Sequence, residues 1–495
     1  MSSKIPSLRR QPNFGRVRRV HMVGIGGIGM SSIAEVLLSR GYTVSGSDLT
    51  KSEVTDRLES MGATIYEGHA ASQIGNPGVV VYSSAIEAET NPETLEAEAR
   101  RIPLISRAIM LGELIRMKFG IGIAGTHGKT TTTSMAGTIV AAGGFDPTVI
   151  VGGKVSVFGS NARSGEGDII LVEADEYDRT FLRLTPSLAV ITNIEEDHLD
   201  TYVDLDDILE SFIQFAGSVP FFGAAIVGLD DPNVQAIMDR IDRRIVTFGY
   251  ARQSDVRAED VRQDGPVMTF DVYHHNELLG RATLNVPGHH NVRNALAAIA
   301  IGLELDMEFD QIETGLRSFT GVQRRMHEIG FENGVRVIDD YAHHPTEIRA
   351  TLEAAGECWK EARIVAVFQP HLYSRTRNFQ EAFARSFFNA DVLVVMDVYG
   401  AREEPIEGID GSVIADLAQS YGHGEVHYVR DRELMPEYVA NLVRDGDVVL
   451  TLGAGDIWRY SRKLVDALST SSNESETGSR EVQQPSQAHQ PTEES

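Results

Sequence analysis

The stretch "FGIGIAGTHGKTTTTSM", residues Phe119 to Met135, joins an apolar run to a glycine-rich turn and a threonine-rich segment. The apolar run predicts a buried strand, and the threonine-rich segment predicts the start of a helix. A glycine-rich turn between a strand and a helix, closed by lysine and threonine, is typical of a loop that holds the phosphates of ATP. The spacing is unusual, because the residue five before Gly128 is Ile123 and not glycine.

The residue types of this loop suit a triphosphate. Backbone amides around Gly125 can turn inward, Lys129 can reach the β- and γ-phosphates, and Thr130 can bind Mg²⁺. The alternative is a lysine in a glycine-rich turn that binds nothing. We favour ATP because Gly-Lys-Thr-Thr follows an apolar strand. The predicted ATP-binding residues of the loop are Gly125, Thr126, His127, Gly128, Lys129, Thr130 and Thr131.

A second glycine-rich stretch, "VGIGGIGMSS" at Val23 to Ser32, lies earlier in the chain. It matches G-x-G-x-x-G between an expected strand and an expected helix, the pattern of a loop for a nucleotide diphosphate. Asp48 ends the next expected strand, where a carboxylate binds ribose in such folds. A turn without a ligand is the alternative, and NAD and a UDP-sugar fit the motif equally. The predicted substrate-binding residues here are Gly24, Gly26, Gly27, Ile28, Gly29 and Asp48.

The length of 495 residues suggests about three domains of roughly 150 residues each. Strands alternating with helices predict an α/β fold with mainly parallel sheets, plus a small β-rich insert around Phe270 to Val286. The expected divisions are an N-terminal extension at 1–17, domains at 18–118, 119–320 and 321–467, and a disordered tail at 468–495.

The formal net charge of −26 disfavours nucleic-acid binding, which asks for a basic face. No apolar run approaches the roughly 20 residues of a membrane helix, and no secretory signal follows the basic N-terminus. We therefore expect a cytoplasmic protein without membrane insertion. Cys358 is the single cysteine, so an intramolecular disulfide is impossible, and we read it as an inert thiol.

Carboxylates follow two expected strands downstream of the ATP loop, in "VEADEYD" and "TNIEEDHLDTY". Such acids suit Mg²⁺ on the phosphates, and Glu173 is the best candidate because it follows its strand at once. His198 is either a metal ligand or a hydrogen-bonded structural histidine. Most of the other acids are expected to be solvated.

Three further groups of polar residues stand at strand ends or helix starts. Asn291 and Asn294 either cap a helix or bind adenine. Of Arg324 and Arg325, one could hold the γ-phosphate and the other lie at the surface. The expected C-terminal sheet presents a set of residues at one face, where ligands favour the carboxyl ends of strands: Asp340, His343, His344, His371 and Arg375.

Taken in order, the motifs resemble those of the Mur ligase family: "GIGGIGMS", "GTHGKTTT", "VEADE", "TNIEEDHLDTY", "PGHHNVRNALAA", "RRM", "DDYAHHPTEI" and "FQPHLYSRT". The resemblance covers roughly residues 18 to 465. It implies a Rossmann-like domain for a UDP-sugar, a central P-loop ATPase, and a C-terminal Rossmann-like domain for an amino acid.

The resemblance also implies roles for individual residues. Lys129, Thr130, Glu173 and His198 are the central-domain set, with Thr130, Glu173 and His198 holding Mg²⁺. Asn291 is implied for adenine, Arg325 for phosphate and Asp340 for the ATP site. His69 and Ser84 are implied for the UDP-sugar, and Arg375 for substrate. His344 is our choice of catalytic residue, although the sequence does not identify which of His343, His344 and His371 is the general base for the amine.

The implied reaction joins L-alanine to the lactyl carboxylate of UDP-N-acetylmuramate through an acyl phosphate, in peptidoglycan precursor synthesis. The segment "DTYVDLDDILESFIQFAGSVPFF" holds no lysine, as in the alanine-adding branch. One alternative is a recycling ligase that attaches a tripeptide to the same sugar nucleotide. An NAD-dependent oxidoreductase is the alternative from another class, and a non-catalytic nucleotide-binding regulator is the last. We expect a monomer or weak homodimer.

Overall fold

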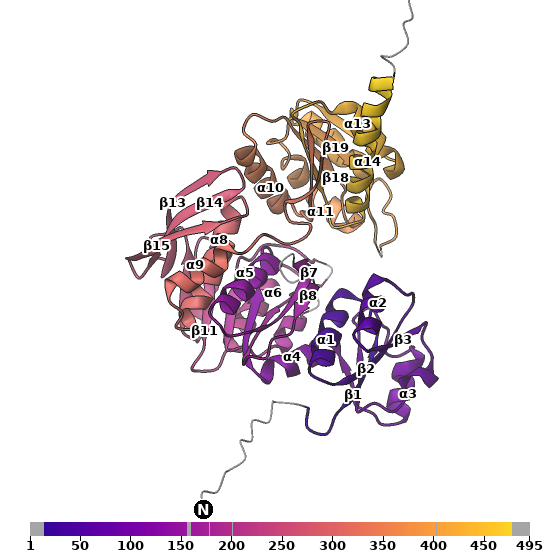
Figure 1. Ribbon diagram of the computed structural model, residues 1–495, viewed down its shortest axis with the longest axis vertical. Coiled ribbons are helices and arrows are strands. Elements are labelled where there is room, and N and C mark those ends of the chain that lie inside the picture. The colour runs from indigo at the N-terminus through magenta and orange to yellow at the C-terminus, as the bar shows by residue number, and fades with distance from the viewer. Residues whose placement is uncertain (1–13, 156–159, 178, 200, 402, 478–495) are drawn as a thin grey trace, which may run out of the picture. The chain divides into compact units, whose positions relative to one another are not determined.

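The computed structural model describes residues 14–155, 160–177, 179–199, 201–401 and 403–477, without the side chains of 153–155, 160–161 and 471–477. The chain divides into two compact units, which follow one another in sequence at Gln323 and Arg324 (Figure 1). Each unit is described by itself.

The first sheet of the first unit has, over the described residues, five parallel strands in the order β3-β2-β1-β4-β5. The strands are β1 Arg19–Val23, β2 Thr43–Asp48, β3 Thr64–Glu67, β4 Val79–Tyr82 and β5 Leu104–Ser106. The helices are α1 Ile28–Ser39, α2 Glu53–Ser60, the 3₁₀ helix η1 Ala71–Ile74, α3 Pro92–Ala99 and α4 Arg107–Arg116. Because β1 is central and the chain winds outward to both sides, the predicted Rossmann-like arrangement is confirmed.

Helix α1 forms where the sequence predicts it. Its apolar residues Ile33, Val36 and Leu37 fall on one helical face and are buried. The helix ends before Gly41, whose φ of +78° is the left-handed conformation that glycine adopts without strain. The glycine-rich loop is thereby held between β1 and a helix that is buried from Met30 to Leu37.

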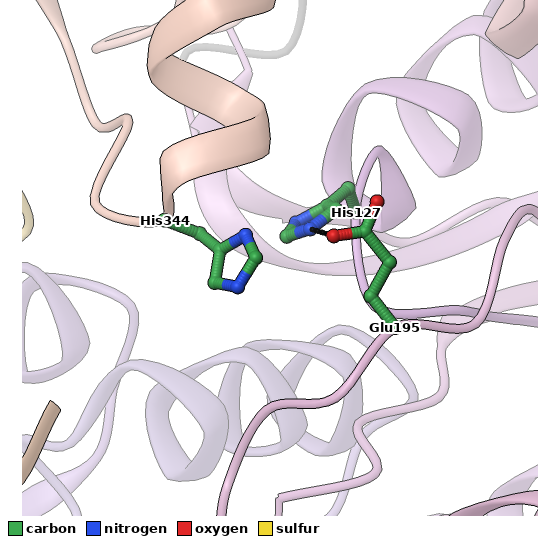
Figure 2. A group of neighbouring side chains, drawn as sticks. All are labelled: His127, Glu195 and His344. Carbon is green, nitrogen blue, oxygen red and sulfur yellow. Dashed lines mark ion pairs between the residues drawn. The ribbon is translucent and has the colours of Figure 1, made fainter. Parts of the chain in front are cut away.

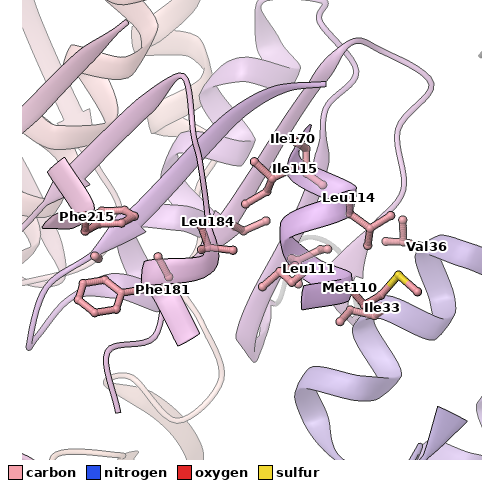
Figure 3. Close-up of a cluster of buried hydrophobic side chains, with 14 of the residues drawn as sticks. Ile33, Val36, Met110, Leu111, Leu114, Ile115, Ile170, Phe181, Leu184 and Phe215 are labelled. Carbon is pink, nitrogen blue, oxygen red and sulfur yellow. The ribbon is translucent and has the colours of Figure 1, made fainter. Parts of the chain in front are cut away.

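Apolar side chains of α1 and α4 belong to the same buried cluster as side chains of the second sheet and its helices (Figure 3). Leu111, Leu114 and Ile115 of α4 join Ile33 of α1 on one side and Phe181 on the other. Helix α4 immediately precedes the strand of the ATP loop, so this burial fixes where that strand begins.

The second sheet has the order β15-β14-β13-β12-β11-β10-β6-β9-β7-β8 over the described residues. Its strands are β6 Phe119–Ala124, β7 Thr148–Val155, β8 Ser160–Arg163, β9 Ile169–Glu173, β10 Leu188–Ile191, β11 Ala224–Gly228, β12 Ile245–Gly249, β13 Val256–Asp264, β14 Val267–His274 and β15 Glu277–Leu284. Its helices are α5 Lys129–Ala142, η2 Thr180–Arg183, α6 Leu205–Gly217, α7 Pro232–Ile237, η3 Met238–Arg240, α8 His289–Glu304 and α9 Phe309–Arg317.

The predicted β-rich insert is larger than expected and is no separate layer. It begins at Val256, and β13 pairs in parallel with β12, so β13 to β15 extend the main sheet as an antiparallel edge. Helices α8 and α9 lie beside these strands (Figure 1). The sequence prediction missed β13 because its second half, "EDVRQD", is mostly charged and alternates partly buried with exposed residues.

Helix α5, which carries the ATP-loop lysine at its first position, is buried along ten consecutive residues from Thr131 to Val140. Helix α9 approaches it at Gly315, where a Cβ would lie 2.5 Å from the Cα of Ile139. Contacts along the whole length of α5 thus hold its first turn, which carries Lys129, in place.

The second unit contains one sheet with the order β16-β17-β21-β18-β19-β20 over the described residues. Its strands are β16 His327–Glu332, β17 Val335–Asp340, β18 Ile364–Phe368, β19 Val392–Met396, β20 Val426–Val429 and β21 Val448–Leu452. Its helices are α10 Pro345–Cys358, α11 Tyr373–Ala384, α12 Gly411–Ser420, η4 Arg432–Leu434, α13 Met435–Leu442 and α14 Ile457–Thr477. Strand β16 is antiparallel and was not predicted; the other pairings are parallel, as expected.

The predicted tail at 468–495 is wrong in its first part. Helix α14 continues to Thr477, because Leu464 and Leu468 anchor it in the core and no glycine or proline interrupts the chain before Gly478. The remainder, 478–495, lies outside the described residues, as does most of the expected extension at 1–17. Within the part of the chain that the structure describes, no helix is long and apolar enough to cross a membrane.

Candidate functional site

Lys129 is the first residue of α5 and lies almost enclosed in the predicted ATP loop. Its ammonium donates to the carbonyls of Gly125, at 2.7 Å, and Thr126, at 3.1 Å, and to Oε1 of Glu176, at 2.8 Å. Burial alone would lower the pKa of Lys129, but the carboxylates of Glu176, Asp175 and Glu173 raise it above its ordinary value. The site therefore holds a permanent cation where a phosphate is expected.

The loop before Lys129 depends on two glycines. Gly125 has φ +131° and Gly128 has φ +83°, both in the region that favours glycine. A Cβ would lie 2.0 Å from Oγ1 of Thr192 at Gly125, and 2.3 Å from Oδ1 of Asn294 at Gly128. The two positions therefore exclude any side chain, and the loop backbone stays accessible to a ligand only with glycine there.

The loop is tied to the turn after β10. The amide of Thr126 donates to the Asn193 carbonyl at 3.0 Å, and the amide of His127 donates to Oδ1 of Asn193 at 2.8 Å. The hydroxyl of Thr126 accepts the amide of Glu195 at 2.8 Å. Thr131 continues the helix and is buried. Of the predicted ATP residues, Thr126 and His127 thus shape the loop through these contacts.

His127 and Glu195 form an ion pair of 3.6 Å between Nε2 and Oε2 (Figure 2). Glu195 is one of the acids of which most were expected to be solvated, and both its amide and its carboxylate contact the loop. Figure 2 also draws His344, which belongs to the second unit.

Thr130 and Glu173 are brought together as predicted. The Thr130 hydroxyl donates to Oε2 of Glu173 at 2.9 Å, and the amide of Gly152 donates to the same oxygen at 2.7 Å. Burial raises the pKa of Glu173. A hydroxyl next to a carboxylate at a phosphate loop is the oxygen donor set that Mg²⁺ prefers, so these two residues fit the ion.

His198 lies beside a different carboxylate. Its Nε2 is 3.7 Å from Oε1 of Glu176 and 3.7 Å from Oδ2 of Asp197, and its ring meets that of Tyr177 edge to face at 5.0 Å. The backbone of His198 is in the left-handed region, with φ +56°. Burial raises the pKa of Glu176 to about 7, against the opposing effect of Lys129. Glu176, which no sequence pattern singles out, therefore lies between Lys129 and His198.

Asn291 and Asn294 are buried in the first turns of α8, whose N-cap is Gly288. The capping interpretation is therefore wrong for both. The side-chain amide of Asn291 donates to the Pro287 carbonyl at 2.7 Å, and that of Asn294 donates to Oδ1 of Asn291 at 3.2 Å. Asn294 also borders Gly128, so α8 contacts the ATP loop directly.

The first glycine-rich loop has a left-handed Gly24, with φ +78°, and Gly27 is the N-cap of α1. The Asp48 carboxylate accepts the amide of Gly26 at 2.8 Å. Asp48, predicted for ribose, thus also fastens the loop. Ile28 is exposed at the start of α1.

Gly29 is covered by a residue that the sequence analysis missed. A Cβ there would lie 2.7 Å from a guanidinium nitrogen of Arg107, the first residue of α4. Arg107 carries no motif signal, because its closeness to the loop depends on the packing of α4 against the sheet.

Of the two sugar-site residues implied by resemblance, His69 is partly buried and Ser84 is exposed. His69 follows β3, and its Nδ1 is 2.9 Å from Oγ of Ser47. Ser83, next to Ser84, is the one that borders Gly24.

In the second unit, Arg324 and Arg325 are both partly buried, so the idea that one lies at the surface is wrong. The Arg324 guanidinium donates to Oδ2 of Asp339 at 3.1 Å and to the Gly453 carbonyl at 2.6 Å, which makes it structural. Arg325 pairs with Oε1 of Glu347 at 3.4 Å.

The Asp340 carboxylate accepts the amides of Met326, at 2.7 Å, and Ala342, at 2.8 Å. Burial raises its pKa to about 6. Its two oxygens therefore join the residue that precedes β16 to the loop that follows β17.

Three histidines of this unit, His343, His344 and His371, follow the carboxyl ends of β17 and β18. The rings of His343 and His371 lie 6.3 Å apart, and His371 stacks on Tyr399 at 5.8 Å. His344 is buried, accepts the amide of Thr346 as N-cap of α10, and meets Phe379 of α11. Arg375 is buried in α11. Of the predicted set, the ring contact brings His343 and His371 together.

This chain belongs to the Mur ligase family. Three family models match it in order: "Mur ligase family, catalytic domain" at residues 19–119, "Mur ligase middle domain" at 123–302 and "Mur ligase, glutamate ligase domain" at 324–455. The predicted family and three-domain α/β class are confirmed, and the oxidoreductase alternative is overturned.

Within the family, the chain is similar to proteins named UDP-N-acetylmuramate–L-alanine ligase. It is 65% identical to that of Salinibacter ruber over 461 residues, which cover 93% of this chain and 97% of the relative. A solved ligase of the same name from Thermotoga maritima has 30% identity and a TM-score of 0.77, with 92% and 99% of the two chains covered. A murein peptide ligase from Psychrobacter arcticus has 26% identity and a TM-score of 0.66, with 91% and 99% covered.

Proposed function

We propose that this chain joins L-alanine to the lactyl carboxylate of UDP-N-acetylmuramate with consumption of ATP, in peptidoglycan precursor synthesis. The use of ATP is supported by two residues at the start of α5. Lys129 lies beside Glu176, and Thr130 lies beside Glu173. The high similarity to alanine ligases over almost the whole chain supports the choice of substrates.

The chemistry begins with attack of the carboxylate on the γ-phosphate of ATP, which gives an acyl phosphate and ADP. The amine of L-alanine then attacks the carbonyl carbon, an amide forms, and phosphate leaves. Both partners of the first step are anions. Lys129 offsets their repulsion and stabilises the charge that spreads over the phosphoryl oxygens.

In this proposal, Lys129 exchanges partners when ATP binds. Its ammonium now contacts two loop carbonyls and Glu176, and phosphate oxygens would replace part of these contacts. Thr130 and Glu173 would hold Mg²⁺, which supplies additional positive charge at the phosphates. His198, next to Glu176, is proposed as a further ligand.

The remaining roles are assigned by resemblance and position. Gly24 to Gly29 and Asp48 take the diphosphate and ribose of the sugar nucleotide. His69 and Ser84 are assigned to the same site by resemblance, and Arg107 by its position next to Gly29. Asn291 takes adenine. In the second unit we assign phosphate to Arg325, the ATP site to Asp340, substrate to Arg375 and proton transfer to His344. The cytoplasmic location and the monomer or weak homodimer remain predictions.

Phosphate release tests the proposal. The purified chain is given ATP, Mg²⁺ and UDP-N-acetylmuramate with each amino acid in turn, and a parallel series receives the tripeptide used in recycling. We expect release with L-alanine above all others. Release with the tripeptide alone would replace the proposal by the recycling reaction, and no release with any acceptor would reject a ligase function.

A further inference from the structure

A buried polar cluster lies inside the N-terminal sheet region, at Glu93 in the first turn of α3. Glu93, His21 and Ser47 have no exposed surface. Oε2 of Glu93 accepts the hydroxyl of Ser47 at 2.6 Å and faces Nε2 of His21 at 3.2 Å. Its Oε1 accepts the amide of Ala70 at 3.2 Å and is 3.9 Å from Nδ1 of His69. One carboxylate thereby joins β1, β2 and the turn after β3.

The carboxylate is ionised in this environment. Burial would raise the pKa of Glu93, but the hydrogen bonds from His21 and Ser47 outweigh it and hold that pKa below its ordinary value. An ionised carboxylate accepts hydrogen bonds and donates none. Every partner that faces Glu93 must therefore present a proton to it.

Counting protons in the cluster fixes the tautomer of His69. A serine hydroxyl has one proton, and Ser47 gives it to Glu93. The 2.9 Å contact between Ser47 Oγ and His69 Nδ1 must then be a hydrogen bond donated by Nδ1. A neutral imidazole protonated at Nδ1 is an acceptor at Nε2. The Nε2 atom of His69 is shielded from solvent and has no hydrogen-bond partner among the described residues.

His69 stands where a nucleotide is expected. It lies two residues after Glu67, which pairs with Asp48 at the carboxyl ends of β3 and β2. Asp48 in turn holds the amide of Gly26 in the glycine-rich loop. In a doubly wound fold, the ligand binds at this end of the strands.

We propose that Glu93 is a positioning residue for the sugar nucleotide: through Ser47 it holds His69 as the Nδ1-protonated tautomer, so that Nε2 accepts a hydrogen bond from the uridine moiety. The inference rests on the proposed function. The diphosphate has no proton to donate at neutral pH. The donors of uridine are N3–H of uracil and the ribose hydroxyls, and His69 takes one of them.

UDP is the probe, with calorimetric titration of the full-length chain. Three analogues each lack one donor: N3-methyl-uridine diphosphate, 2′-deoxy-UDP and 3′-deoxy-UDP. We expect the chain to bind one analogue about tenfold more weakly than UDP and the other two nearly as well. The weakened analogue identifies the donor. Equal binding of UDP and all three analogues would overturn the inference.

Glu93→Gln tests the positioning role. A glutamine amide can donate to Ser47, which frees the serine proton for Nδ1 and moves the histidine proton to Nε2. We expect UDP to bind about tenfold more weakly, the preference over the weakened analogue to vanish, and KM for the sugar nucleotide to rise while kcat and KM for ATP stay unchanged. The exposed Glu98→Gln, on the same helix, is the matched control.

Nitrogen NMR of histidine-labelled protein reads the tautomer directly, with His69→Gln used to assign the signal. We expect the protonated nitrogen to be Nδ1 in the parent chain and Nε2 in Glu93→Gln. If Glu93→Gln does not fold, Ser47→Ala removes only the connecting hydroxyl, and the same loss of discrimination is expected. A parent chain protonated at Nε2 alone, or a Ser47→Ala variant that still discriminates, would overturn the inference. Failure of the parent chain to bind UDP at all would instead reject the proposed function.

Discussion

The ammonium of Lys129 and the carboxylate of Glu176 lie 2.8 Å apart, with exposed side-chain fractions of only 13% and 4%. This pair occupies the ATP loop before any phosphate enters. It also keeps the lysine extended across the loop, in contact with the carbonyls of Gly125 and Thr126.

We predict that Lys129→Ala abolishes phosphate release while UDP binding persists. The lysine stabilises charge that develops on the phosphoryl group, and the loss of one such contact typically costs about 10²–10³ in rate. Phosphate release and UDP calorimetry measure the two effects. The exposed Lys360→Ala is the control. Near-normal turnover of Lys129→Ala would remove this residue from the mechanism.

Gly128→Ala is expected to destabilise the chain and to prevent ATP binding. It forces alanine into a left-handed backbone and places Cβ 2.3 Å from Asn294 Oδ1. Gly144→Ala is a matched control, since Gly144 has φ +82° with open space around it. The control isolates the backbone cost of roughly 1–2 kcal/mol. Thermal unfolding and ATP titration should show a larger loss at Gly128; equal losses would mean that the contact with α8 has no effect.

Glu173→Gln should raise the Mg²⁺ concentration needed for half-maximal phosphate release by about tenfold, because a charged ligand becomes neutral. The exposed Glu89→Gln leaves that concentration unchanged. UDP affinity is expected to stay the same in both variants. An unchanged Mg²⁺ requirement in Glu173→Gln would show that this carboxylate does not hold the ion.

Asp340 gives the folded chain a defined pH dependence. Its pKa is raised to about 6, so the native state keeps this proton at pH values where the unfolded chain has lost it. The stabilising contribution is complete below the ordinary pKa of about 3.9 and is lost as pH rises through about 6, an effect of up to about 3 kcal/mol. Unfolding midpoints of the parent chain and Asp340→Asn, compared from pH 4 to pH 8, should converge or cross as pH rises. Parallel curves would contradict the raised pKa.

Cys358 should react slowly with thiol reagents. Burial raises its pKa to about 11, so little thiolate exists at neutral pH. Alkylation at pH 7.5 is expected to be about a hundredfold slower than that of free cysteine, and Cys358→Ser should keep full activity. Because the chain has one cysteine, mass spectrometry reads the rate without ambiguity. Fast modification would disprove the interpretation as an inert thiol.

The sequence predicts well what depends on local pattern. The strands before both loops, the helix starts at Lys129 and Ile28, and the pairing of Thr130 with Glu173 follow from apolar runs and from residues at strand ends. The motif order also identifies the family. These features are short-range or lie at the same edge of a parallel sheet, so chain order alone brings them together.

The rest depends on contacts between segments far apart in the chain. Glu176 was one of several acids, and only the turn after β9 shows that it reaches Lys129. Arg107 reaches Gly29 through the packing of α4. In the sequence, Glu93 is one of many acidic residues at the start of a helix. Only the position of α3 in the fold shows that its carboxylate contacts Ser47. No spacing rule encodes such distances.

The absence of a side chain at Gly315 limits which substitutions this protein can tolerate. Since the backbone of α9 touches that of α5 there, even alanine would press on Ile139 in the helix that begins with Lys129. Variation at this remote position is therefore constrained by the chemistry at the other end of α5. Positions of this kind should resist random mutagenesis as strongly as the loop itself, although no ligand comes near them.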